Sequence, residues 1–237
     1  DTADVVIVGG GAAGLATAVF CARAATNKRI VCTDTARSVG AKILVSGGGR
    51  CNVTNRVVNE GDFWGGDRRV IRNVLRAFPA SRAAEFFDGL GVTLHEEEDG
   101  KLFPDTNRAR TVLDALLHEV QGAGAELHRA QRVVAVDRVD RGFSVETAAG
   151  ESFTASVVVL ATGGRSLPKT GSDGTGYDLA RRLGHGYVDT TPALVPLMLD
   201  DACHARLAGV ALPAAVTIRA AGRRVVRLEG AMLVLLV

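Results

Sequence analysis

The sequence predicts an α/β fold, in which a Rossmann-like domain containing a β-meander is followed by the start of a second, mainly β domain. Three observations support this prediction: a glycine-rich turn between an apolar strand and an alanine-rich helix near the N-terminus, several short strand candidates over residues 126–160, and β-branched segments after residue 190. We place the domain boundary near Asp189, so that residues 1–189 form the Rossmann-like domain and residues 190–237 an incomplete β-rich domain.

The N-terminal turn has the spacing of a dinucleotide-binding site. Residues 5–8 form a β-branched apolar run typical of a central parallel strand. Gly9, Gly11 and Gly14 then match the G-x-G-x-x-G pattern, whose glycines allow the turn, the approach of a pyrophosphate and close packing of helix on sheet. We therefore expect phosphates to face the N-terminus of the following helix.

An acidic residue completes this pattern. Residues 29–33 form a second strand that ends at Asp34, about 20 residues beyond the last glycine, where a carboxylate can accept hydrogen bonds from a ribose. The glycine spacing taken alone could also belong to a flexible loop, and the motif does not distinguish NAD from FAD.

Composition excludes several classes of protein. The chain has 237 residues, 47% of them hydrophobic, and a formal net charge of +2 with dispersed basic residues, which argues against a nucleic-acid partner. Residues 3–22 are nearly uncharged, but Asp1, Asp4 and three consecutive glycines argue against a signal peptide or membrane span. The four cysteines are scattered, which favours a reduced, cytoplasmic setting.

The middle of the chain is predicted to hold a polar loop and three helices. Residues 38–55 lack a helical period, and their glycines and polar side chains suit a loop that wraps a polar or anionic ligand. Helices are expected over residues 68–78 and 79–90, and a third begins after Asp105 or Thr106 as N-cap. Phe86 and Phe87 are interpreted as core, and the acidic run 96–99 as a solvated turn without a metal.

The strand candidates after residue 125 favour one cofactor. Residues 126–136, 143–147 and 152–155 are expected to form a meander, which leads into a central strand over residues 157–160 that ends in Ala-Thr-Gly-Gly. This order is found in flavoproteins of the two-dinucleotide-binding type, so FAD is the leading ligand, and a nicotinamide-only dehydrogenase is the alternative. A helix is expected over residues 177–183, and strands at 195–199, 215–219 and 224–228.

Three motifs together resemble one family. The glycine turn, the loop Ser-Gly-Gly-Gly-Arg-Cys-Asn over residues 46–52, and Ala-Thr-Gly-Gly over residues 161–164 are similar to the NAD(P)/FAD-dependent oxidoreductases of the BaiN/aminoacetone oxidase group. The resemblance implies an FAD-dependent oxidoreductase that transfers hydride between a small organic substrate or NAD(P)H and FAD. It also implies that the chain is the N-terminal portion of a longer protein, so a non-catalytic dinucleotide-binding fragment is a third hypothesis.

The resemblance also implies roles for individual residues. The pyrophosphate would lie at the glycine turn, the ribose at Asp34, the adenine at the backbone of Val134, and the phosphates and flavin along the 46–52 loop. The full set comprises Gly9, Gly11, Ala12, Ala13, Gly14, Asp34, Ser46, Gly47, Arg50, Cys51, Asn52, Val134, Thr162 and Gly163. Arg50 could pair with phosphate or reduced flavin, or lie on the surface, whereas Cys51 lacks a neighbouring thiol and is interpreted as a packed loop residue. The five histidines are isolated, so no catalytic acid or base is assigned.

Overall fold

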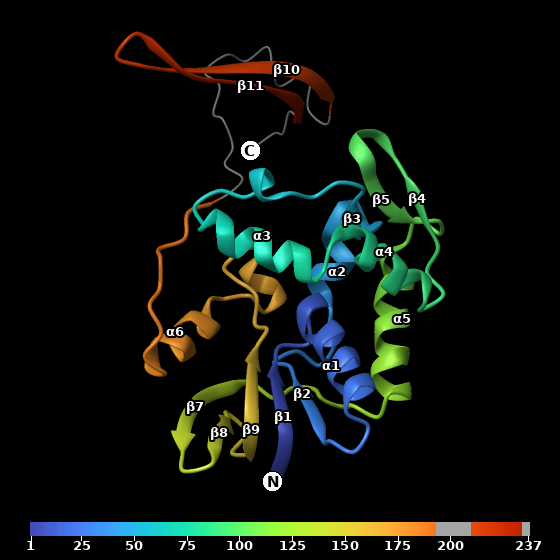
Figure 1. Cartoon of the computed structure of the whole chain (residues 1–237), viewed down its shortest axis with the longest axis vertical. Coiled ribbons are helices and arrows are strands. Elements are labelled where there is room, and N and C mark those ends of the chain that lie inside the picture. The colour runs from blue at the N-terminus through green and yellow to red at the C-terminus, as the bar shows by residue number, and fades with distance from the viewer. Residues whose placement is uncertain (193–209, 234–237) are drawn as a thin grey trace. The chain divides into compact units, whose positions relative to one another are not determined.

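The structure, a computed structural model, describes residues 1–192 and 210–233 (Figure 1). The chain divides into two units, Asp1–Asp189 and Thr190–Val237, which are described separately.

Unit 1 is built on a six-stranded sheet. Four strands are parallel, and the last three form an antiparallel meander that shares one of them. The order across the sheet is β6 (Glu126–His128), β2 (Ile30–Thr33), β1 (Thr2–Val8), β9 (Ser152–Leu160), β8 (Gly142–Thr147) and β7 (Val133–Val139). The sheet confirms the predicted Rossmann-like α/β architecture, with the strand that precedes the glycine turn at its centre.

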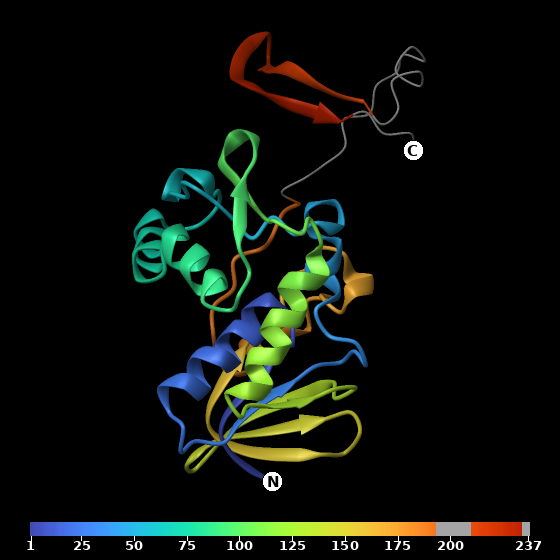
Figure 2. The ribbon, with the colours of Figure 1, turned by 90° about the vertical axis from the view of Figure 1, so that its right-hand side faces the viewer.

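Apolar residues cover both faces of the central strands. On one face, α1 (Ala12–Ala24) and α5 (Ala109–Gly122) lie side by side, and their Leu15 and Leu116 pack with Ile7 and Ile30 (Figure 2). On the other face, a second cluster combines residues of β1 and β2 with residues of the meander and of α6 (Thr175–Arg182). Burial on both faces explains why residues 5–8 carry no polar side chain.

The meander differs from the expected one at both ends. The segment expected as one strand over residues 126–136 forms two strands, because β6 pairs with β2 at the far edge whereas β7 pairs with β8. The two strands expected at 152–155 and 157–160 are the continuous β9, which pairs with β8 at its start and with β1 along its length.

Two helical expectations also need correction. The segment expected as a loop contains a short helix, α2 (Ala41–Val45), followed by the 3-10 turn Ser46–Gly49. Helix α5 begins at Ala109 with Arg108 at the N-cap position, and neither Asp105 nor Thr106 caps it.

A small layer of two helices and a three-stranded sheet completes unit 1. Helix α3 (Arg68–Ala77) begins at the N-cap Asp67, which accepts hydrogen bonds from the first turn, and α4 (Ala80–Asp88) follows Pro79. The sheet has the order β3 (Thr54–Asn55), β5 (Lys101–Pro104) and β4 (Leu94–Glu96), and short 3-10 turns lie at Glu60–Asp62, Glu98–Gly100 and Pro168–Thr170. Val70 and Val74 on the apolar side of α3 are exposed, so this helix has no buried face.

The described part of unit 2 is a β-hairpin. Strands β10 (Ala211–Ala220) and β11 (Arg223–Leu233) are antiparallel and contain the segments expected as strands at 215–219 and 224–228. Ala221 and Gly222 connect them with positive φ angles of 49° and 76°, as a tight hairpin turn requires. The strand expected at 195–199 lies outside the described residues.

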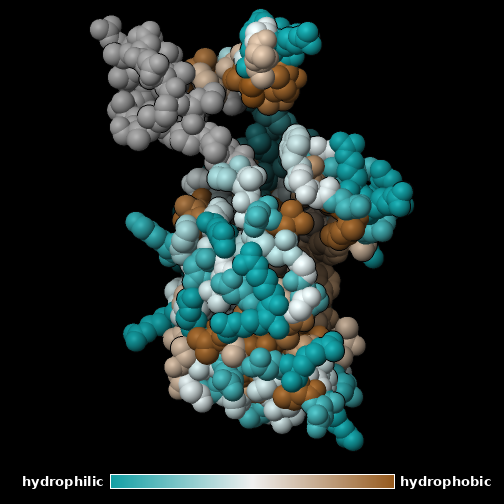
Figure 3. All heavy atoms as spheres, turned by 90° about the vertical axis from the view of Figure 1, so that its left-hand side faces the viewer, coloured by the Kyte–Doolittle hydropathy of each residue, from teal (hydrophilic) through white to brown (hydrophobic). Residues whose placement is uncertain are grey.

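The surface of unit 1 is largely polar on the face shown in Figure 3, where apolar residues form separate patches. Within the described ranges, no helix is both long enough and apolar enough to cross a bilayer.

Candidate functional site

A cavity of about 910 Å³ lies in unit 1 where β1, β2 and β9 end. Its lining includes Val8, Thr33 and Leu160, the last residues of these three strands. Ligands of open α/β sheets bind beyond the carboxyl ends of the strands, and cofactor sites typically have volumes of ~300–1,000 Å³. Both the position and the size of this cavity suit a nucleotide cofactor.

The glycine turn at the cavity has different steric limits at each of its glycines. Gly9 has a φ of 114°, and a Cβ there would lie 2.5 Å from the carbonyl oxygen of Ala161. A Cβ on Gly14 would lie 1.7 Å from the carbonyl oxygen of Gly9, so helix and turn can pack only with glycine. A Cβ on Gly11 would meet no atom within 4 Å. Gly9 and Gly14 therefore serve packing, whereas Gly11 leaves open space toward the cavity.

The first turn of α1 presents backbone donors to that space. Gly11 is the N-cap of α1 in an extended conformation, and it has no side chain to bond the N–H groups of the first turn. Gly11, Ala12 and Ala13 all line the cavity. The N-terminus of a helix carries a partial positive charge of roughly half a unit, so this end of the cavity suits an anion.

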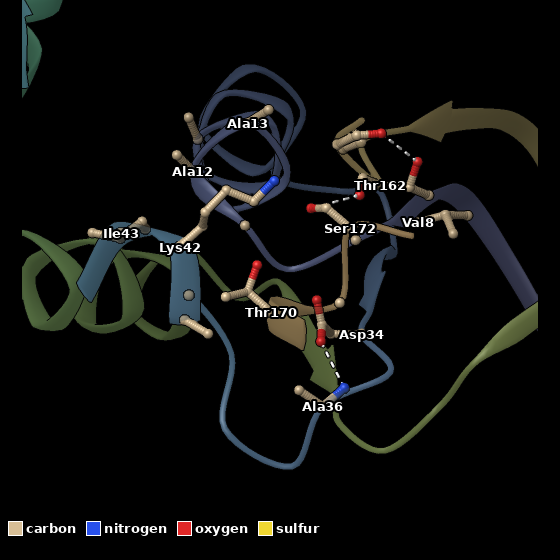
Figure 4. A pocket seen from close by; sticks show the side chains of 18 of the residues that line it. Val8, Ala12, Ala13, Asp34, Ala36, Lys42, Ile43, Thr162, Thr170 and Ser172 are labelled. Carbon is tan, nitrogen blue, oxygen red and sulfur yellow. Dashed lines mark hydrogen bonds between the residues drawn. The ribbon is translucent and has the colours of Figure 1, made fainter. Parts of the chain in front are cut away.

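Asp34 connects the end of β2 to the glycine turn. One carboxylate oxygen accepts a hydrogen bond from the N–H of Gly10 at 2.6 Å, and the other accepts one from the N–H of Ala36 at 2.7 Å (Figure 4). Each carboxylate oxygen can accept a second hydrogen bond, so Asp34 can hold the turn and still bind two hydroxyls of a ribose.

The segment after β9, next to the glycine turn, forms another part of the cavity wall. Gly163 has a φ of 74°, and a Cβ there would lie 2.6 Å from the hydroxyl oxygen of Ser172. The Ser172 hydroxyl is buried and donates to the carbonyl oxygen of Thr162 at 3.4 Å. This contact fixes the small residues after β9 against the following segment, and both Thr162 and Gly163 line the cavity.

The loop after α2 contributes three of its predicted residues. Ser46, Cys51 and Asn52 line the cavity. Cys51 has a φ of 67° and is buried, and burial raises the pKa of its thiol. A thiol held protonated in this way suits packing better than nucleophilic chemistry.

Four of the predicted binding residues lie outside the cavity lining, namely Gly14, Gly47, Arg50 and Val134. Gly14 packs under the glycine turn, and Gly47 lies against Phe103, where a Cβ would be 2.8 Å from the ring. The side chain of Val134 is exposed, and its carbonyl oxygen accepts a hydrogen bond from Arg182 at 3.3 Å, while the neighbouring Val133 lines the cavity.

Arg50 has partners on the other side of its loop. Its guanidinium lies 2.6 Å from the carboxylate of Glu97 and 4.2 Å from the centre of the Phe103 ring. The hydrogen bond from Arg50 is the main cause of the lowered pKa of Glu97. Because these contacts engage the guanidinium, Arg50 stabilises the loop and lies away from the cavity.

Several lining residues were not predicted from the sequence. Arg132 lies next to Val133 and donates hydrogen bonds to Asp173 at 2.7 Å and to Thr175 at 2.8 Å. The pKa of Asp173 is lowered mainly by the hydrogen bond from Thr175 and then by that from Arg132. Lys42 reaches the cavity from α2. Neither residue belongs to a recognisable motif, so only the tertiary structure identifies them.

Aromatic side chains form another part of the lining. Phe86 and Phe87 are half-buried and line the cavity with Phe20 and Phe78. The rings of Phe20 and Phe86 are stacked with centres 4.9 Å apart. The expected core role of Phe86 and Phe87 is thus combined with a position at the apolar part of the cavity.

Comparison with known proteins identifies the family. Residues 3–226 match the family described as the HI0933-like protein Rossmann domain. The chain belongs to this family. The predicted resemblance is confirmed by a curated relative, a 3-dehydro-bile acid delta(4,6)-reductase from Clostridium scindens, which is 36% identical over 89% of this chain and 51% of its own length.

Another curated relative has a different substrate. A ribosomal RNA dihydrouridine synthase from Escherichia coli is 32% identical over 90% of this chain and 53% of its own length. The chain therefore spans about half the length of these relatives.

Solved structures share the fold at low sequence identity. A flavocytochrome c3 fumarate reductase in its open conformation matches 77% of this chain and 40% of its own, with a TM-score of 0.55 and 21% identity. THI4 from Thermovibrio ammonificans matches 78% of this chain and 64% of its own, with a TM-score of 0.51 and 19% identity. Membership of this family supports FAD as the cofactor of the Rossmann-like unit.

Proposed function

We propose that residues 1–189 form the FAD-binding domain of an FAD-dependent oxidoreductase that transfers hydride between FAD and a small organic substrate or NAD(P)H. The observation that carries this proposal is the open space beside Gly11, in front of the uncapped first turn of α1. Any side chain at this position would fill the space that a phosphate needs. The strand ends, the glycine turn and Asp34 thus present what the ADP half of FAD requires.

The residues around the cavity divide between the two halves of the cofactor. The N–H groups of Ala12 and Ala13 would bind the pyrophosphate, the carboxylate of Asp34 the adenosine ribose, and the segment around Val133 the adenine. Ser46, Cys51 and Asn52 would lie along the flavin half, as would Thr162 and Gly163. FAD supplies the hydride-transfer chemistry when bound, and the protein contributes position, electrostatics and exclusion of water.

The curated relatives suggest the direction of the reaction. One is named as a delta(4,6)-reductase of a 3-dehydro-bile acid and another as a dihydrouridine synthase, and both names denote the reduction of a carbon–carbon double bond conjugated to a carbonyl group. We infer that the whole protein reduces a substrate of this kind. A small unsaturated ketone is the favoured substrate, because the net charge of +2 offers little attraction for RNA.

The proposal is tested by the ligand and by the reaction. The purified chain should bind FAD and show the visible absorption of an oxidised flavin, and a chain that binds NADH but no FAD would instead be a nicotinamide-only dehydrogenase. In the full-length protein, anaerobic reduction by NADPH should bleach the flavin, and an unsaturated ketone should restore the absorption. Restoration only by uridine-containing RNA would assign the RNA substrate, and a flavin that no reductant bleaches would indicate a non-catalytic binding protein.

A further inference from the structure

Lys42 is a cation that reaches the same cavity as the first turn of α1 but from a different element, α2. It lies in α2, and its side chain extends into the cavity toward the start of α1 (Figure 4). Its Nζ atom is 3.4 Å from the place that a Cβ on Gly163 would take. Gly163 follows Thr162, whose Cα would be 3.0 Å from a Cβ on Gly9, so the ammonium lies close to the glycine turn.

The backbone of α2 fixes the position of Lys42. The adjacent Ile43 is 6% exposed and belongs to the core beneath α1 and α5. Gly40, the N-cap of α2, has a φ of 76°, and a Cβ there would lie 2.4 Å from a methyl group of Leu113. With Ile43 inserted in the core and Gly40 against α5, the helix can hold the Lys42 side chain toward the cavity.

No acidic side chain neutralises Lys42 within residues 1–192 and 210–233, where its ammonium has neither an ion pair nor a hydrogen bond. Two carboxylates line the same cavity, but each has other partners. The carboxylate of Asp34 accepts hydrogen bonds from the N–H groups of Gly10 and Ala36, and that of Asp173 accepts hydrogen bonds from Arg132 and Thr175.

Two positive groups therefore face the same space without an anion between them. The N-terminus of α1 and an ammonium repel each other in a cavity that is largely apolar, and an anion placed between them removes this repulsion and binds both. On the basis of the proposed function, we propose that Lys42 binds the pyrophosphate of FAD together with the first turn of α1.

The test compares Lys42→Met and Lys42→Arg with the wild-type chain. Methionine keeps the length of the side chain and removes the charge, whereas arginine keeps the charge. Lys28→Met is the matched control, because Lys28 pairs with Asp4 at 2.8 Å just before β2, at the end of the sheet remote from the cavity. Dissociation constants for FAD are measured by quenching of flavin fluorescence at several salt concentrations, and those for ADP by competition with FAD. Circular dichroism verifies that each variant folds.

Lys42→Met should lower the affinities for FAD and for ADP by similar factors of at least about tenfold, because a charge-assisted hydrogen bond to phosphate is lost. The variant should also show a shallower dependence of FAD affinity on salt, because one ionic contact is missing. The FAD affinity of Lys42→Arg should stay within about threefold of the wild-type value. The FAD affinity of Lys28→Met should equal the wild-type value.

Equal FAD affinity in Lys42→Met and wild type would overturn the proposal, and so would a loss confined to FAD with ADP unaffected, which would assign Lys42 to the flavin half. A wild-type chain that binds no FAD would instead refute the proposed function. The two failures are therefore distinguishable.

Discussion

Substitutions at Gly11 and Gly14, two positions of the same glycine turn, should affect different properties: the first FAD binding and the second the stability of the fold. In Gly14→Ala the new Cβ would lie 1.7 Å from the carbonyl oxygen of Gly9, so the helix must move away from the turn. Overpacking against backbone costs about 3 kcal/mol, which for a chain of this length lowers Tm by about 6–12 °C. Gly11→Ser introduces no such contact, and serine at an N-cap is favoured over glycine by a few tenths of a kcal/mol.

The expected effect of Gly11→Ser on the cofactor is the opposite of its effect on the fold. The serine side chain would fill the phosphate position. Its hydroxyl oxygen would also accept a hydrogen bond from an N–H group of the first turn that the pyrophosphate would otherwise bind. Loss of two charge-assisted hydrogen bonds, at about 1.5–3 kcal/mol each, corresponds to a loss of FAD affinity of at least about a hundredfold.

Thermal unfolding of the apo-proteins and fluorescence titration with FAD measure the two effects independently. Gly11→Ser should melt within about 2 °C of the wild type and lose FAD. Retention of FAD by this variant would show that the phosphates do not lie at α1, and a wild-type Tm in Gly14→Ala would refute the packing role of Gly14.

Three further substitutions test other parts of the site and the fold. Asp34→Ala should lower the affinity for FAD at least tenfold, and a wild-type affinity would exclude the ribose contact. The same variant should lower the free energy of unfolding, measured in urea, by about 1–3 kcal/mol, because two hydrogen bonds from backbone N–H groups are lost. Arg50→Met should change FAD affinity by less than about threefold, whereas a larger loss would place its guanidinium on the cofactor. The hydrogen bond from Arg29, followed by that from His128, lowers the pKa of Glu126 from 4.5 to about 2. The ionised carboxylate therefore stabilises the fold above about pH 4.5, and this contribution is lost as the pH falls toward 2. Glu126→Gln should therefore be less stable than the wild type at pH 7, with a deficit that shrinks across this window, and a constant deficit would contradict the assignment.

The parts of the site that were predicted from the sequence depend on local backbone geometry. Gly9, Gly11 and Gly14 lie within one strand–turn–helix unit, and Asp34 follows the next strand, so their spacing alone predicts their arrangement. The short strand candidates after residue 125 also indicated the flavoprotein type of fold. The edge strand β6 was not separated from β7, because residues 129–132 between them contain no glycine or proline that would mark a turn.

The unpredicted parts depend on contacts between distant segments. The direction of Arg50 is set by Glu97, 47 residues away, and by glycines with positive φ before it, and no local pattern reveals this. Lys42 was not predicted because an isolated lysine has no motif, and only the tertiary structure brings α2 to the cavity that the first turn of α1 also lines. A helix was predicted over residues 68–78, but the exposure of Val70 and Val74 on α3 was not.

A crystal structure of the chain with FAD tests the central claim most directly. The account predicts the pyrophosphate within hydrogen-bonding distance of the N–H groups of Ala12 and Ala13, the ribose at Asp34, and the flavin half toward Ser46, Cys51 and Asn52. An ADP half bound away from the first turn of α1, or a cavity that stays empty at saturating FAD, would contradict it.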